Sequence, residues 1–423
     1  MVKSDNLIIH LFIGLVIFLG ALLIFLVTNN APIYFFYFAY LLLIITTVYS
    51  SGLISFGSIF IYGFTAFVGS KILLSPFNLT VDYFIESYSI TEETNMIITG
   101  LWVWVLYLFL FGYNSIISTK QDIPSQKVGL LLKSIFVVAV ALATMNAATL
   151  AVYVSQEGYQ ALYESGTGFG TTVARASSIL FLSLITYKNP RVTLKLAPVI
   201  LLLAVGYFIT GVRANALILI LFVVFLYYDV RGVEPKISSF VIGAVTIVSI
   251  LMYVQWYRQG FTWTSDLNLV EYIITSQNKT FYLPGILIES NALAESKYSV
   301  LSILSNFVCT TECTSGDILS QEIMGELYYE GHGVGGIGIV DFLFSFMSFP
   351  LGSIIVFVLG ILVAEANNHR SKYLILFPLI FLSFYSHRSN AGYYIIMAIS
   401  FFVVLRIWVE IEKKLSKKTM RTT

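Results

Sequence analysis

Long apolar runs separated by short polar connections dominate the pattern of this sequence. Runs of about 17–25 mostly apolar residues recur along the chain, and each is long enough to cross a bilayer as an α-helix. The first, from Leu7 to Val27 behind Lys3, is too long for the apolar region of a signal peptide and lacks a small-residue cleavage site. The pattern predicts twelve spans, near residues 7–27, 32–49, 52–74, 96–117, 129–151, 171–187, 194–210, 214–230, 237–255, 337–364, 373–387 and 391–409.

The tenth predicted span and the connection before it depart from this regular pattern. The span that starts at Ile337 is long and contains Pro350, which predicts a kink there or an interfacial turn before the helix. Residues 256–336 form a connection of about eighty residues without a convincing span. Within it, residues 317–329 and 267–275 have the spacing of amphipathic helices. We therefore expect an all-α polytopic membrane protein, one transmembrane domain over 1–423, with a helical lid at 256–336 between the ninth and tenth spans.

The distribution of basic residues predicts which side of the membrane each connection faces. With the N-terminus in the cytoplasm, seventeen of the twenty-four Lys and Arg residues fall on inner connections or at the two chain ends. Cytoplasmic connections carry this excess in membrane proteins generally. Both termini are therefore expected in the cytoplasm, and the 256–336 loop on the opposite side of the membrane.

Composition supports lipid as the solvent. Apolar residues make up 57% of the chain and charged residues only 11%, whereas soluble proteins carry about 25% charged residues. Mean hydropathy is +0.85. A soluble fold is thereby excluded. The net charge of +1 gives no indication of a nucleic-acid partner, and we expect none.

The two cysteines, Cys309 and Cys313, both lie in the long outer loop. In an oxidising compartment they could close a small disulfide loop, or they could remain free thiols on one helical face. A zinc site is not expected, because two thiols without nearby histidines provide too few ligands.

Four arginines lie at outer ends of predicted spans, where basic residues are otherwise scarce. Arg213 lies in the segment Gly-Val-Arg-Ala-Asn, between two spans with almost no connection, and Arg175, Arg258 and Arg388 lie at three other outer ends. A guanidinium group beside a helix N-terminus suits bidentate binding of phosphate. The simpler interpretations are snorkelling to lipid headgroups or pairing with outer acids. We take these arginines as candidate diphosphate ligands.

The glycine-rich segment 326–341, Glu-Leu-Tyr-Tyr-Glu-Gly-His-Gly-Val-Gly-Gly-Ile-Gly-Ile-Val-Asp, is the second unusual feature. His332 lies between two glycines with Glu330 close by in sequence, and Tyr328 could pack against a sugar. A histidine on an outer loop is a reasonable general base for a hydroxyl group, although a purely structural role is equally open. No strand precedes the glycines, so they do not indicate a nucleotide-binding loop.

The chain resembles bacterial O-antigen polymerases of the Wzy type, which are related to the O-antigen ligase superfamily. The resemblance rests on about twelve spans, a large late outer loop, the Gly211–Asn215 segment and the Tyr-Tyr-Glu-Gly-His-Gly segment. It implies an inverting glycosyltransferase of the bacterial inner membrane that needs no metal or other cofactor. Such an enzyme joins oligosaccharide repeat units carried on undecaprenyl diphosphate at the periplasmic face. The resemblance also implies a chain-length regulator protein as a partner.

The resemblance further implies roles for particular residues. Arg213 would bind the diphosphate leaving group, while Arg258 and His332 match the family's other outer-loop arginine and its late-loop histidine in general placement. Arg388 and Arg175 are further candidate substrate ligands by their placement at outer helix ends alone. His332 would deprotonate the acceptor hydroxyl, with Glu330 or Glu326 as alternatives.

Three other functions remain open. An O-antigen ligase, which transfers finished polymer to a lipid A core, would have similar features. A glycosyltransferase with a polyprenyl monophosphate donor usually has an acid in its first outer loop, and residues 28–32 contain none. A flippase or secondary transporter would be expected to show repeated halves and charges near the membrane midplane.

Overall fold

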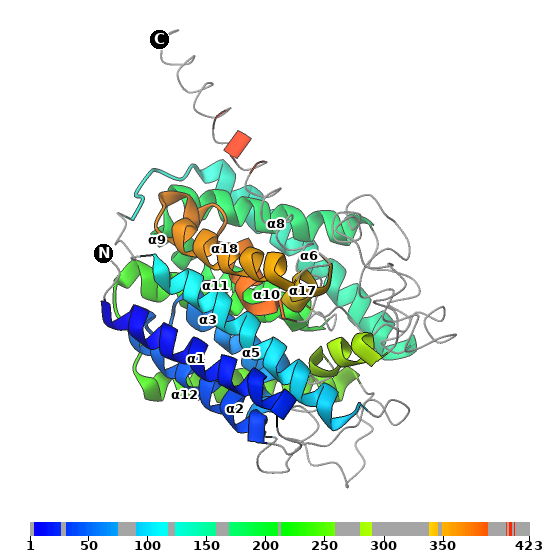
Figure 1. Ribbon diagram of the computed structural model, residues 1–423. Helices are drawn as coiled ribbons and strands as arrows, with labels where there is room; N and C mark the ends of the chain where they lie inside the picture. Colours follow the sequence, from blue (N-terminus) through cyan, green and yellow to red (C-terminus); the bar gives the residue numbers. More distant parts are fainter. Residues whose placement is uncertain are drawn as a thin grey trace.

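The computed structural model describes residues 4–26, 31–74, 90–116, 123–157, 169–209, 213–258, 280–289, 338–345 and 349–387, together with four single positions after 400. Every regular element in these ranges is a helix (Figure 1). Five of the described helical segments are long and apolar enough to cross a bilayer: Ala31–Ser51, Phe56–Leu73, Glu92–Ser115, Leu130–Tyr153 and Phe349–Asn367. The all-helical class is therefore confirmed for the described part of the chain.

The first third of the chain forms a compact group of helices. These are α1 (Ser4–Leu26), α2 (Ala31–Ser51), α3 (Phe56–Phe64), the π-helical turn η1 (Thr65–Gly69), α4 (Ser70–Leu74) and α5 (Glu92–Ser115). Side-chain caps fix two of the starts, because the hydroxyl oxygens of Ser55 and Thr91 accept hydrogen bonds from the amides of Ser58 and Thr94. The predicted span 52–74 is thus one helical column that contains a π turn.

The middle of the chain forms longer helices with short connections. These are α6 (Leu130–Glu157), α8 (Phe169–Lys188), α9 (Pro190–Lys195), α10 (Ala197–Ile209), α11 (Arg213–Arg231) and α12 (Ile237–Arg258). Asn189 caps α9, and Pro190 occupies its first turn, where a missing amide hydrogen costs nothing. Residues 280–289 form a further short helix.

The tenth and eleventh predicted spans are interrupted. The tenth consists of the 3₁₀ turn η3 (Gly338–Val340), α17 (Asp341–Ser345) and α18 (Phe349–Asn367). The eleventh consists of the 3₁₀ turn η4 (Arg370–Tyr373) and α19 (Leu376–Tyr385). Pro350 lies in the first turn of α18, and Gly352 of α18 packs against the backbone of Phe342 and Leu343, so α17 and α18 are not one straight helix. The ten residues of α19 extend only about 15 Å, roughly half of the hydrocarbon thickness.

Each of the first eleven predicted spans thus coincides with one helix or with consecutive helices. The twelfth, 391–409, lies mostly outside the described residues, and the count of twelve spans stays a prediction. The lid helices proposed at 267–275 and 317–329, and both cysteines, also lie outside the described residues.

Close helix packing builds the centre of the molecule. Helix α5 packs against α1, α2 and α18, while α19 packs against both α3 and α11; Figure 1 shows α6 and α8 on the opposite side of the bundle from α1 and α2. At Gly112 and Gly360 the backbones of α5 and α18 come so close that a Cβ atom would overlap the facing carbonyl group. Small residues commonly permit such contacts between membrane helices.

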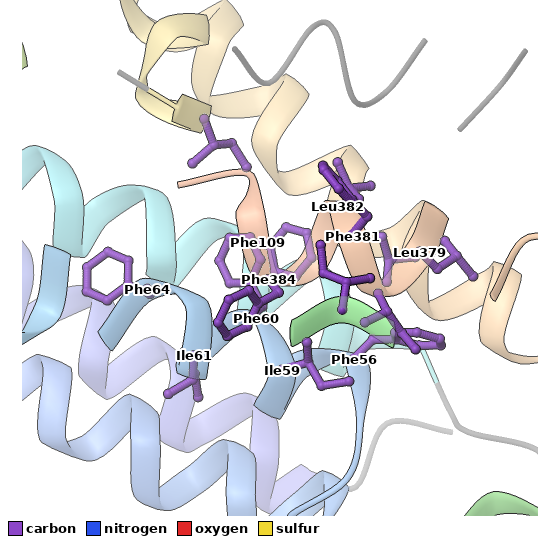
Figure 2. Close-up of a cluster of buried hydrophobic side chains, with 14 of the residues drawn as sticks. Phe56, Ile59, Phe60, Ile61, Phe64, Phe109, Leu379, Phe381, Leu382 and Phe384 are labelled. Carbon is purple, nitrogen blue, oxygen red and sulfur yellow. The ribbon is translucent and has the colours of Figure 1, made fainter. Parts of the chain in front are cut away.

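Aromatic rings fill the space between α3, α5 and α19. The rings of Phe60 and Phe109 stack with centroids 3.6 Å apart, and Phe384 lies beside them (Figure 2). The Phe56 ring stacks on Phe225 of α11 at 4.8 Å. In contrast, α6 and α12 carry many exposed apolar side chains, such as Leu130 at 78% and Ile237 at 73% exposed, as lipid-facing surfaces do.

Candidate functional site

Among the sequence-predicted site residues, Arg175 is the one whose side chain lies within the described part of the structure. Arg213 is the first residue of α11 and Arg258 is the last residue of α12, but the description does not extend to their side chains. Tyr328, Glu330, His332 and Arg388 lie outside the described residues. Their predicted roles are therefore neither supported nor opposed by the structure.

The structure connects Arg175 with the segment that contains Arg213. The Arg175 guanidinium carbon lies 4.7 Å from the centroid of the Tyr207 ring, a cation–π contact between α8 and α10. The side chain of Asn215 forms a hydrogen bond with the Tyr207 hydroxyl. Asn215 is two residues after Arg213, so two of the four predicted arginines belong to one part of the bundle, where α8, α10 and α11 meet.

A buried cation at the end of the α3–α4 column was not among the predicted site residues. Lys71 is only 6% exposed, and its Nζ atom lies 4.9 Å from the centroid of the Tyr282 ring. One signal for it is present in the sequence, because Lys71 is one of the few basic residues at a predicted outer end. An apolar context, Gly-Ser-Lys-Ile-Leu-Leu, would have predicted its burial.

Tyr282 belongs to the short helix 280–289, which comes from the predicted outer loop yet packs into the bundle. Leu283 and Leu287 are 0% exposed, and the indole nitrogen of Trp102 donates a hydrogen bond of 3.2 Å to the carbonyl oxygen of Phe281. This helix is not predictable from the sequence pattern, because ten residues are too few for a span and its apolar positions lack an amphipathic period. Residues 280–289 of the predicted outer loop are therefore packed against the bundle.

A carboxylate fastens the end of this helix to the start of α5. Glu289 Oε1 accepts hydrogen bonds from the Thr91 amide at 2.9 Å and from the Thr91 hydroxyl at 3.0 Å. Burial by itself would raise the pKa of the Glu289 carboxyl, but the hydrogen bonds from Thr91 and Thr94 hold that pKa below its ordinary value. The ionised form of Glu289 is therefore the one that fastens the two helices.

The structure also brings together two segments that the sequence analysis selected separately. Gly338, at the end of the glycine-rich segment, lies against the backbone of Ser386 and His387, next to Arg388 in the chain. A Cβ atom on Gly338 would lie 2.6 Å from the Ser386 carbonyl oxygen and closer still to that of His387. Gly338 also has φ +62°, a conformation that side chains rarely adopt. The glycine at this position is thus required by both contact and conformation.

The His387 side chain is fully buried at this junction. Its Nε2 atom lies 3.0 Å from the carbonyl oxygen of Phe60, and its ring meets those of Phe60 and Phe64 edge to face at 4.3 and 5.4 Å. A carbonyl oxygen can only accept, so Nε2 carries the hydrogen in the neutral ring. The Nδ1 atom is left as an acceptor, and it has no hydrogen-bond partner in the described part of the chain.

No group of three or more His, Cys, Asp or Glu side chains that could hold a metal ion occurs among the described residues. Comparison of the chain with protein-family models, with curated proteins and with solved structures finds no significant match.

Proposed function

We propose that this protein is a metal-independent, inverting glycosyltransferase that polymerises oligosaccharide repeat units carried on undecaprenyl diphosphate, as O-antigen polymerases do. In this proposal the chain crosses the bacterial inner membrane about twelve times, with both termini in the cytoplasm and the site on the periplasmic side. The cluster of Arg175, Tyr207 and Asn215 beside the start of α11 is the observation that supports it best.

The chemistry of the reaction explains why cations would gather there. The acceptor hydroxyl attacks the anomeric carbon of the donor, the bond from that carbon to the diphosphate breaks, and the lipid diphosphate departs with increased negative charge. Guanidinium groups fixed in a dry site stabilise such a charge most strongly. Arg213 would bind the diphosphate, Arg175 would support it through Tyr207 and Asn215, and a histidine would take the hydroxyl proton. His332 is the histidine that the sequence suggests for this step.

Single alanine variants in a strain that lacks the gene test this proposal. Surface polysaccharide is separated on a gel, and we expect Arg213→Ala and Arg175→Ala to leave core with a single repeat, because elongation stops while ligation and export continue. Removal of one such charge-stabilising group typically lowers a rate about 10²–10³-fold.

A matched control comes from the other end of α11. The Arg231 guanidinium lies 4.6 Å from the centroid of the Tyr227 ring, so Arg231→Ala removes the same kind of contact far from the proposed site and should give a full ladder. Bare core in the Arg213 and Arg175 variants would indicate a ligase, and blocked export a flippase. A full ladder from both variants at normal expression would refute the proposal.

A further inference from the structure

Three buried polar side chains around the end of α19 each have an atom without a hydrogen-bond partner among the described residues. Ser383, Ser386 and His387 are each 0% exposed. The hydroxyl oxygens of both serines and Nδ1 of His387 have no hydrogen-bond partner in the described part of the chain. Positions 383, 386 and 387 are three and four residues apart, which places them on one side of a helical turn. We refer to Ser383, Ser386 and His387 as the α19 polar cluster.

Such a cluster is costly unless something binds to it. A buried polar group without a partner destabilises a protein, and native structures contain few of them. The α19 polar cluster offers two hydroxyls, which donate and accept, and one imidazole nitrogen, which only accepts. A hydroxyl group fits this set, because it donates to the imidazole and accepts from a serine. The hydroxyl could belong to a sugar or to water.

The His387 ring is held as a general base needs to be held. Phe60 fixes the tautomer through its carbonyl oxygen at 3.0 Å, and the Phe60 and Phe64 rings restrict the orientation of the imidazole. Figure 2 shows Phe60 among the packed aromatic side chains beside Phe109 and Phe384, and its ring stacks on that of Phe109, so its position is itself fixed by packing. When Nδ1 gains a proton, Nε2 can keep its hydrogen bond to Phe60.

We propose that the α19 polar cluster binds the hydroxyl group of the acceptor sugar and that His387 Nδ1 takes its proton. This inference rests on the proposed function and replaces His332 as the base. The proton passes from the acceptor oxygen to Nδ1 while that oxygen forms its bond to the anomeric carbon. The bond from the anomeric carbon to the diphosphate breaks, and its electron pair leaves with the lipid diphosphate. No further reactant is needed.

The cluster is closed in this structure, so the acceptor can enter only after a movement. The backbone contact between Gly338 and residues 386–387 is the place where two interrupted spans meet, and it involves turns and not regular helix packing. Irregular backbone at membrane depth occurs where protein buries it or where it lines a cavity. In this proposal the acceptor enters when the Gly338 turn separates from the 386–387 turn, whose backbone it contacts, and closure of the two turns then excludes water.

The test uses the purified full-length protein in lipid nanodiscs with lipid-linked repeat units extracted from a strain that lacks the gene. We expect His387→Gln to lower kcat about 10²-fold or more, the usual effect of losing a general base. Binding of undecaprenyl diphosphate, measured separately, should be unchanged. His10→Gln is the matched control, because His10 is also buried and its Nδ1 also lacks a partner, but it lies in α1 beside Asn114. That variant should keep the wild-type kcat.

Serine variants keep the test decisive if His387→Gln does not fold. Ser383→Ala and Ser386→Ala should each raise KM for the lipid-linked repeat about fivefold, as expected for one lost hydrogen bond. Ser183→Ala, at a buried serine of α8 that also lacks a partner, should leave KM unchanged.

Each result decides between the two proposals. If wild-type protein forms no polymer, the proposed function fails and this inference fails with it. If wild-type protein is active while His387→Gln keeps its kcat or the serine variants keep their KM, the α19 polar cluster holds water only and this inference fails alone. Loss of kcat in His332→Gln but not in His387→Gln would return the role of base to His332.

Discussion

Tyrosine rings are the common partners of cations in this bundle. Arg175, Lys71 and Arg231 lie 4.7, 4.9 and 4.6 Å from the ring centroids of nearby tyrosines. A ring face stabilises a partly desolvated cation without neutralising it. The contact of this kind at Arg175 lies in the part of the bundle that we propose binds the diphosphate.

At the predicted cytoplasmic end, Lys372 has a carboxylate partner in addition to a tyrosine ring, since its Nζ atom also lies 5.0 Å from the centroid of the Tyr373 ring. Lys372 Nζ donates to one oxygen of Asp229 at 2.8 Å, and the Tyr373 hydroxyl donates to the other at 2.7 Å. The Lys372 side chain is 7% exposed and that of Asp229 is 22% exposed. This ion pair joins the end of α11 to the turn before α19 and so fixes the two helices that border the proposed site.

Removal of the lysine from this pair should destabilise the protein. We expect Lys372→Met to lower the free energy of unfolding by about 3 kcal/mol, because a partly buried carboxylate then loses its counter-charge. The combined change Asp229→Asn with Lys372→Met should restore most of that loss. Thermal melting in detergent micelles measures both, with exposed Lys195→Met as a control expected to change stability by less than about 0.5 kcal/mol. A double variant no more stable than the single one would contradict this account.

At the scale of elements, glycine positions decide how closely the helices approach. Gly63 of α3 lies against the carbonyl group of Phe384 in α19, with no room for a Cβ atom. Helix α12 is the opposite case, since a Cβ atom on its Gly243 would meet nothing within 4 Å. Helices α3 and α19 thus belong to the packed centre, which includes the proposed α19 polar cluster, whereas α12 lies at the edge of the bundle.

Alanine at these two glycines should therefore have opposite effects. We expect Gly63→Ala to destabilise the protein by about 1–3 kcal/mol, because α3 and α19 must move apart. Gly243→Ala should stabilise it by about 0.5–1 kcal/mol, because alanine favours a helix over glycine. The melting temperatures of the two variants give the comparison. Equal shifts in both would show that the close contact between α3 and α19 is not required.

At the scale of the whole molecule, the orientation in the membrane is the property that the proposed function needs most. The proposed diphosphate site around Arg175 and the start of α11 must face the compartment in which the lipid-linked repeats are assembled. The basic residues predict that the start of α5 faces outward and that the connection before α12 faces inward. Glu92 and Lys236 are exposed at these two places.

Single cysteines at these positions test the predicted orientation. In a background with Cys309→Ser and Cys313→Ser, Glu92→Cys should react with a membrane-impermeant maleimide on intact spheroplasts. Lys236→Cys should react only after the membrane is permeabilised, because a charged reagent cannot cross it. The reverse pattern would place the proposed diphosphate site in the cytoplasm and contradict both proposals.

The sequence by itself determined where most helices lie along the chain, and it predicted that lipid and not water surrounds them. Runs of apolar residues mark where a backbone must satisfy its own hydrogen bonds in lipid, so the first eleven predicted spans fall on observed helices within a few residues. The apolar runs also identified Arg175 and the Arg213 segment as candidates. A charged residue at the end of an apolar run is costly whichever helices pack beside it. The sequence also marked the glycine-rich segment and the outer end at Arg388 as unusual, but as separate features.

Only the tertiary structure decided which of these features meet. Helix 280–289 is too short to be recognised as an inserted segment, and its burial depends on Trp102 and Thr91, nearly two hundred residues earlier in the chain. The same holds for Tyr207 beneath Arg175 and for Phe60 beside His387. Apolar periodicity records whether a residue is buried but not against which helix, since lipid and a neighbouring helix are equally apolar. Partners across the bundle are set by the three-dimensional fit of side chains and glycines.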